Sequence, residues 1–165
     1  MTYKQQHIYH YFIDAWGDWF CEGNPVDDQQ LFSILSRGIV EEDGKYVIRC
    51  EGEVHPVEVA DAPLWVRYIH VGKNADGTVK SVEVELRDGR REPLAADALT
   101  LERGNALYCL ATPKRLKTRF GKAAYYEFAD LLGMEEESGV FYITIAGRRY
   151  DIRSVSEPEP GPESA

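Results

Sequence analysis

Two pairs of segments in this chain match each other, and this internal match constrains the fold more than any other feature of the sequence. Ile13–Cys21 aligns with Leu101–Cys109 without a gap, and Gly44–Val59 aligns with Gly139–Ser154. In both halves a proline follows the cysteine at the same interval, and a helix pattern comes next. The displacement is 88 residues at the cysteines and 95 at the glycines, so the second half has gained seven residues, most of them in a basic run. We therefore expect an internal duplication.

Short runs of aromatic, β-branched or alternating residues, separated by turns rich in Gly, Asn and Asp, predict hairpins of antiparallel strands. The predicted strands are Ile8–Ile13, Trp19–Glu22, Lys45–Cys50, Val54–Val59, Leu64–Val71, Val79–Leu86, Leu99–Leu101, Ala106–Leu110, Val140–Ile145 and Arg149–Val155. A helix capped by Asp27 or Asp28 is expected to run through Leu35, and Gly38 ends it. A second helix is indicated where Tyr125, Phe128, Ala129 and Leu132 share one apolar face.

These patterns predict an α+β protein of two tandem similar lobes, each mostly antiparallel β with one helix. We expect residues 1–71 to form the N-terminal lobe and residues 72–155 the C-terminal lobe. Residues 156–165, SEPEPGPESA, are expected to be a disordered acidic tail because they carry no large apolar side chain.

Composition narrows the classes of partner. The formal net charge is -9, and a net acidic protein is poorly suited to the backbone of DNA or RNA, so we expect no nucleic acid polymer as partner. No apolar run approaches the length of a membrane span, and no membrane partner is expected. The N-terminus, MTYKQQHIYHYF, lacks the long apolar core of a signal peptide, so we expect a cytoplasmic location. The cysteines Cys21, Cys50 and Cys109 are odd in number and lack CxxC spacing, which is typical of reduced thiols.

The densest basic run lies just before the second helix and includes Lys114, Arg115, Lys117, Arg119 and Lys122. Cations at this place repel one another and oppose the helix dipole, so something must offset them. Acidic neighbours elsewhere in the fold would do so, and so would a bound anion.

A bound anion would contact the cations and the free N–H groups of the first helical turn. The predicted ligand-binding residues are Arg119, Lys122 and Lys117, with Gly121 for close backbone approach and Trp16 for stacking. We expect Arg119 and Lys122 to face a groove between the lobes.

Several segments resemble the bacterial family called Domain of Unknown Function 1285 (DUF1285). They are GDWFCEGNPV with the helix after it, DGKYVIRCEGEVHPVEVADAPLWV, DGRREPL and AAYYEFADLL. The positions that fit the family pattern are Trp19, Gly23, Pro25, Val26, Leu31, Phe32, Val59, Asp61, Ala62, Pro63, Tyr125, Tyr126 and Glu127. The chain departs from the pattern at the Gly17-Asp18 turn and in the basic run. The resemblance implies two similar α+β lobes, the second like a pleckstrin-homology domain, with a nucleotide site between the lobes and a signalling role.

No catalytic signature is present: there is no phosphate-binding glycine loop, no GxSxG motif and no Ser/His/Asp spacing. His7, His10, His55 and His70 are too scattered to share a metal, so no catalytic residues, metal site or cofactor are predicted. The first hypothesis is a small anionic, nucleotide-like ligand between the lobes. The second is a protein-interaction module without a small ligand, with a protein partner left open. The third is an enzyme of unreadable type, and the oligomeric state stays undetermined.

Overall fold

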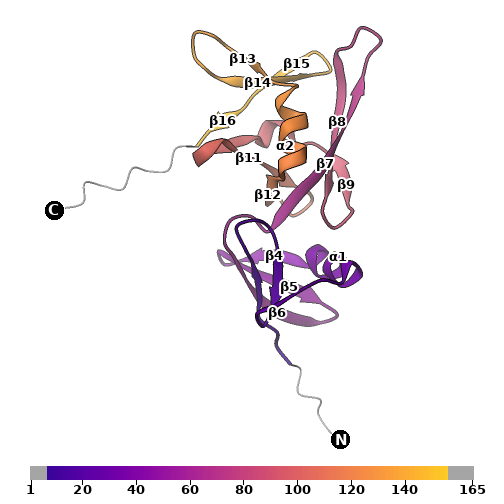
Figure 1. Cartoon of the computed structure of the whole chain (residues 1–165), viewed down its shortest axis with the longest axis vertical. Coiled ribbons are helices and arrows are strands. Elements are labelled where there is room, and N and C mark those ends of the chain that lie inside the picture. The colour runs from indigo at the N-terminus through magenta and orange to yellow at the C-terminus, as the bar shows by residue number, and fades with distance from the viewer. Residues whose placement is uncertain (1–6, 156–165) are drawn as a thin grey trace, which may run out of the picture.

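The computed structural model describes residues 7–155. The tail that was predicted to be disordered, 156–165, lies outside the described residues. The described chain folds into an N-terminal body, a C-terminal body and a waist between them (Figure 1). Within residues 7–155 no helix is long and apolar enough to cross a membrane.

The N-terminal body is a six-stranded sheet with one helix. Its elements are β1 (Tyr11–Ile13), β2 (Trp19–Cys21), β3 (Asn24–Pro25), α1 (Gln29–Arg37), β4 (Ile39–Glu42), β5 (Lys45–Cys50) and β6 (Glu53–Val59). The strand order is β3-β2-β1-β6-β5-β4, in which β1 and β6 run parallel and the other neighbours antiparallel. As predicted, an aspartate caps α1, since the Asp28 carboxylate accepts a hydrogen bond from the Leu31 N–H, and Gly38 ends the helix.

The C-terminal body repeats this plan. Its later elements are β10 (Thr100–Glu102), β11 (Ala106–Ala111), β12 (Leu116–Phe120), α2 (Lys122–Ala129), β13 (Gly133–Met134), β14 (Phe141–Ile145), β15 (Arg148–Asp151) and β16 (Arg153–Ser154). The strands are ordered β12-β11-β10-β16 in one sheet and β13-β14-β15 in another, and β10 and β16 run parallel. Only Ile152 separates β15 from β16, so together they take the place of β6.

Strand registers confirm the two similar lobes and locate the repeats at residues 11–59 and 100–154. Ile13 pairs with Trp19, and Leu101 pairs with Leu107 after a displacement of 88 residues. In the later hairpins Ile48 pairs with His55 and Ile143 with Tyr150, a displacement of 95 residues. The parallel pairs correspond as well, because Ile13 lies opposite Val59 and Leu101 opposite Ser154. The first helical residues, Gln29 and Lys122, are 93 apart.

The basic run was expected to lead directly into the second helix, but part of it is the strand β12. Leu116, Thr118 and Phe120 are buried, whereas Lys117 and Arg119 alternate with them on the other face. This period-two pattern favours a strand over a helix. The β11–β12 hairpin, with its turn at residues 112–115, is longer than the corresponding β2–β3 hairpin. This difference accounts for much of the length gained by the second repeat.

Three additional antiparallel strands lie between the repeats: β7 (Leu64–Lys73), β8 (Val79–Leu86) and β9 (Arg91–Pro93). Because β7 pairs in parallel with β12, these strands extend the second sheet to seven strands. Figure 1 shows β7 and β8 rising from the waist beside α2. The predicted domain boundary between residues 71 and 72 falls within β7, and the pleckstrin-homology form of the second lobe stays a prediction.

The core contains buried aliphatic and aromatic side chains from both repeats, including Ile13, Ile48, Phe128 and Ile143, and from β8, including Leu86. Trp19 and Trp65 are buried as well, with 5% and 8% of their surfaces exposed. Helix α1 packs against β5 of its own repeat, whereas α2 packs against β7, which lies between the repeats.

Candidate functional site

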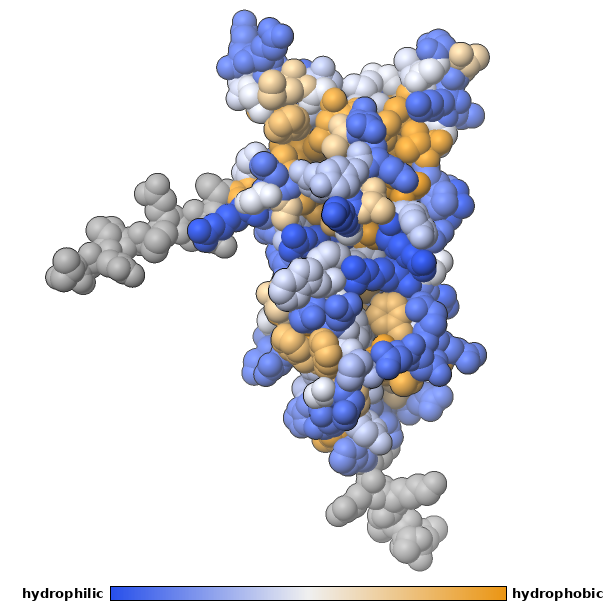
Figure 2. All heavy atoms as spheres, viewed as in Figure 1, coloured by the Kyte–Doolittle hydropathy of each residue, from blue (hydrophilic) through white to orange (hydrophobic). Residues whose placement is uncertain are grey.

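A cleft of about 770 Å³ lies at the waist and is called the waist cleft below. Two segments that correspond in the repeats line it. Ala15, Trp16 and Asp18 come from the turn between β1 and β2, and residues 104–107 come from the turn after β10 and the start of β11. The remaining lining comes from Trp65 and Arg87 and from residues at the junction of β12 and α2. Figure 2 shows hydrophilic residues crossing the waist on the visible face.

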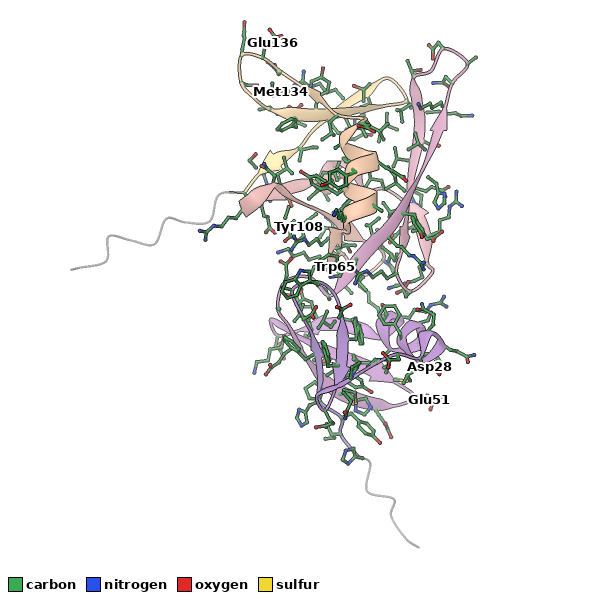
Figure 3. The ribbon with its side chains drawn as sticks, in the orientation of Figure 1. Asp28, Glu51, Trp65, Tyr108, Met134 and Glu136 are labelled. Carbon is green, nitrogen blue, oxygen red and sulfur yellow. The ribbon has the colours of Figure 1, made fainter. Side chains whose placement is uncertain are left out.

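Arg119 lines the waist cleft, but its charge is already paired. Its guanidinium donates a 2.7 Å hydrogen bond to the Asp61 carboxylate, which also accepts from the Tyr108 hydroxyl at 2.7 and 2.9 Å. The guanidinium lies 5.1 Å from the centre of a Trp65 ring. Trp65 and Tyr108 are both seen at the waist in Figure 3. Arg119 therefore helps to hold the two bodies together.

The pKa shifts in this cluster follow from its burial and its hydrogen bonds. Burial alone would raise the pKa of Asp61, but the hydrogen bonds from Tyr108 and Arg119 and the charge of Lys117 outweigh it, so the pKa is lowered. Burial and the adjacent carboxylate raise the pKa of the Tyr108 phenol. At neutral pH the cluster thus holds an ionised carboxylate and a protonated phenol.

Lys117 and Gly121 do not line the waist cleft. The Lys117 ammonium lies 2.9 Å from Glu102 and 3.7 Å from Asp61. Gly121 donates its N–H to the Val66 carbonyl at 2.9 Å, and a Cβ added to it would lie 3.0 Å from that oxygen. Close packing against β7 therefore accounts for the glycine. The expectation that acidic neighbours offset the basic run is confirmed for Lys117 and Arg119.

Lys122 and Trp16 remain available in the waist cleft. Lys122 is exposed at the first position of α2 and makes no hydrogen bond or ion pair with any residue that the structure describes. Trp16 is 73% exposed on the β1–β2 turn, and Tyr126 of α2 is 61% exposed. A cation and two exposed rings thus border one hollow. No side chain caps α2, in contrast to Asp28 on α1.

Arg87 is a cleft residue that the sequence analysis missed. Its guanidinium lies 4.7 Å from the centre of the Trp65 ring and has no hydrogen bond or ion pair within residues 7–155. Burial lowers its pKa, and Asp18 and Asp14 partly offset this effect. Gly17 makes room for this pair, because a Cβ on it would lie 2.5 Å from Arg87 Nη1 and 2.6 Å from Trp65 Nε1. No local signal in the sequence distinguishes this arginine from Arg90 or Arg91.

A second hollow of about 400 Å³ shares Arg87 and Asp18 with the waist cleft. Arg67 adds a further cation, but Asp27 and Asp28 also line this hollow, so carboxylates offset its positive charge. The waist cleft is therefore the more favourable place for an anion to bind. The structure brings Arg119, Lys122 and Trp16 together there and leaves Lys117 and Gly121 outside.

The architecture defines an α+β protein built from two tandem repeats, and two solved structures share it. A DUF1285 family protein from Silicibacter pomeroyi DSS-3 matches with a TM-score of 0.69 and 18% identity, over 88% of this chain and 80% of that one. A DUF1285 family protein from Shewanella baltica OS155 matches with a TM-score of 0.57 and 21% identity, over 73% of this chain and 90% of that one. The chain therefore has a DUF1285-like fold, which confirms the fold implied by the sequence resemblance.

No family model matches the chain. No curated protein matches it either.

Proposed function

We propose that this protein binds a small anionic ligand with a planar ring, of the nucleotide class, in the waist cleft. The observation that carries the proposal is the meeting of two cations that lack ion-pair partners in residues 7–155, Arg87 and Lys122, with the exposed rings of Trp16 and Tyr126. Cations attract phosphate, and exposed aromatic rings provide stacking faces. The cleft volume of about 770 Å³ lies within the range of small-molecule sites.

Arg119 is paired with a carboxylate and Lys122 is not, and this difference supports a role for Lys122 in binding. Asp61 engages Arg119, so that arginine fixes the cleft wall. Lys122 lies next to the uncapped first turn of α2, where backbone N–H groups add positive potential. A role in signalling in the cytoplasm is part of the proposal, and the three free cysteines agree with a reducing compartment.

Thermal-shift and calorimetric titrations with adenine and guanine nucleotides test this proposal. We expect one saturable site and a raised melting temperature, with binding weakened about tenfold to a hundredfold in Lys122→Ala, because a charge-assisted hydrogen bond contributes about 1.5–3 kcal/mol. Trp16→Ala should weaken a nucleotide more than inorganic phosphate, since only the nucleotide has a ring to stack.

Lys45→Ala is the matched control, because Lys45 is an exposed lysine at the start of β5, outside the lining of the waist cleft. Equal binding by the Lys45 and Lys122 variants would overturn the proposal. A co-purifying protein without any nucleotide shift would favour the protein-interaction module. Consumption of the bound nucleotide would favour an enzyme.

A further inference from the structure

Helix α1 and helix α2 occupy equivalent places in the repeats, but only α1 has its outer row covered. Gln29, Ser33 and Ser36 form that row on α1. The Gln29 amide donates to the Arg87 carbonyl at 3.2 Å, and the Ser33 hydroxyl donates to the Asp88 carbonyl at 2.8 Å. The Ser36 hydroxyl donates to the buried Asp88 carboxylate at 2.7 Å. The turn between β8 and β9 therefore lies on α1.

The corresponding row on α2, displaced by 93 residues, is open. It consists of Lys122, Tyr126 and Ala129, all three of which are exposed. No hydrogen bond or ion pair joins this row to another element among the described residues. Figure 2 shows apolar residues gathered on the upper body, where Figure 1 draws α2 between β7–β8 and the β13–β15 sheet.

A cavity of about 200 Å³, called the α2 cavity below, lies beside this open row. Its apolar lining includes Leu101, Leu107, Tyr125, Phe128, Met134 and Phe141, and none of the described residues that line it is charged. In the first repeat the equivalent residues are Gly17, Trp19, Phe32 and Ser36. With Trp65 and other residues of β7 and β8 they line a hollow of only about 10 Å³, and the first three also border the charged, open hollow of about 400 Å³ described above. At this place the first repeat thus has a nearly closed hollow and a charged one, whereas the second repeat has an apolar cavity.

Three differences between the repeats open the α2 cavity. Trp19, whose ring meets Phe32 edge-on at 5.3 Å, is replaced by the smaller Leu107. Ser36 is replaced by Ala129, which removes the hydroxyl that holds the Asp88 turn. Glu41, opposite Tyr46, is replaced by Met134, opposite Phe141, which makes the rim apolar. Figure 3 shows Met134 above α2.

We propose that the α2 cavity binds a small uncharged aromatic molecule of about the size of indole. Apolar cavities of about 150 Å³ accept benzene, so a cavity of about 200 Å³ has room for a slightly larger aromatic molecule such as indole. The indole rings of Trp19 and Trp65 line the small hollow at the equivalent place of the first repeat. Asn105 supplies an amide at the end of the cavity nearest the waist cleft, and its oxygen can accept a hydrogen bond from a ring N–H.

Titration of the full chain with indole, followed by amide and methyl chemical shifts, tests this proposal. We expect one saturable site whose shifts centre on α2, β10 and β14. Leu107→Trp restores the residue of the first repeat, and it should abolish indole binding and raise the melting temperature. Met134→Glu, which restores the residue of Glu41 at an exposed position, should weaken binding about tenfold through the loss of apolar contact. This second variant decides the question if Leu107→Trp fails to fold.

Lys122→Ala is the control, because Lys122 lines the waist cleft and does not line the α2 cavity. This variant should lose nucleotide affinity and keep indole affinity, so the two proposals fail or succeed separately. Equal indole binding by wild type, Leu107→Trp and Met134→Glu would overturn the aromatic site. It would also be overturned if sedimentation showed a dimer that Met134→Glu dissociates, because the open face would then be an interface between two copies.

Discussion

The Arg119 guanidinium donates a 2.7 Å hydrogen bond to the Asp61 carboxylate across the waist of the molecule. Asp61 lies in the connection between β6 and β7, and Arg119 lies on β12 of the second repeat. A basic residue that the sequence presents as a candidate ligand contact is therefore part of the joint between the bodies. The same carboxylate accepts from Tyr108, which is 4% exposed, whereas the side chains of Asp61 and Arg119 are 20% and 33% exposed, so the joint is partly buried.

Replacing Arg119 with alanine should lower stability without any ligand. The substitution leaves Asp61 without its strongest charged partner, and we expect a loss of about 2 kcal/mol, equivalent to about 4–8 °C in melting temperature. Differential scanning calorimetry measures it. Lys122→Ala should melt within about 1 °C of the wild type, because an exposed unpaired lysine contributes little. Two variants with the same melting temperature would show that the Asp61 contact contributes nothing to stability.

Acid should weaken the waist through Asp61. Because its folded-state pKa is lowered below the ordinary value of about 3.9, the carboxylate stabilises the fold above that value, and this contribution is lost as pH falls through the folded-state pKa. The free energy of urea unfolding of wild type should therefore exceed that of Asp61→Asn by a constant amount above about pH 5, and the gap should narrow below about pH 4. A gap that stays unchanged down to pH 2.5 would contradict the assignment.

Gly17 should tolerate substitution far less well than Gly23. Both have positive φ, +83° and +82°, so alanine carries the same backbone cost of about 1–2 kcal/mol at either position. Only at Gly17 would the new Cβ also meet the Trp65 ring and Arg87, whereas Gly23 faces open space. We expect Gly17→Ala to lose at least about 2 kcal/mol more than Gly23→Ala in chemical denaturation. Equal losses of stability in the two variants would show that Trp65 and Arg87 can move away from position 17 without a cost in free energy.

The cap of α1 should contribute about 1 kcal/mol. The Asp28 carboxylate accepts the Leu31 N–H at 2.9 Å, so Asp28→Ala leaves that donor without its cap. Asp27→Ala is the control, because Asp27 is an exposed aspartate beside the cap and makes no hydrogen bond that the described structure shows. Urea midpoints of the two variants measure the difference, and a larger loss for Asp27→Ala would contradict the observed cap.

The alternation of apolar and charged residues made several strands predictable. Lys45–Cys50 and Val79–Leu86 have the bounds predicted from the sequence. Val79–Leu86 alternates, and Lys45–Cys50 is a short β-branched and aromatic run between turns rich in Gly and Asp. β12 was missed since its alternation is hidden within a basic run, and charge drew attention away from Leu116 and Phe120. The short strand β4 was missed as well because two of its four residues are glutamates.

The candidate site was less predictable than the fold. Lys122, Arg119 and Trp16 were predicted and do line the waist cleft. Arg87 and Trp65 could not be placed there from the sequence, because the β7–β8 hairpin brings them to the waist from a segment outside both repeats. Gly121 was interpreted as a ligand approach, whereas its backbone meets the Val66 carbonyl. A glycine in the sequence indicates that another group comes close to the backbone, but it does not show whether that group is a ligand or another part of the protein.

The parallel pairing of β1 with β6 places the first strand of the N-terminal body in the middle of its sheet. During synthesis this body cannot close when its first hairpin leaves the ribosome, because the central pairing partner of β1 arrives more than 40 residues later. Until then β1 presents an unpaired edge to other chains. The same order of events recurs in the second repeat, where β10 must wait for β16.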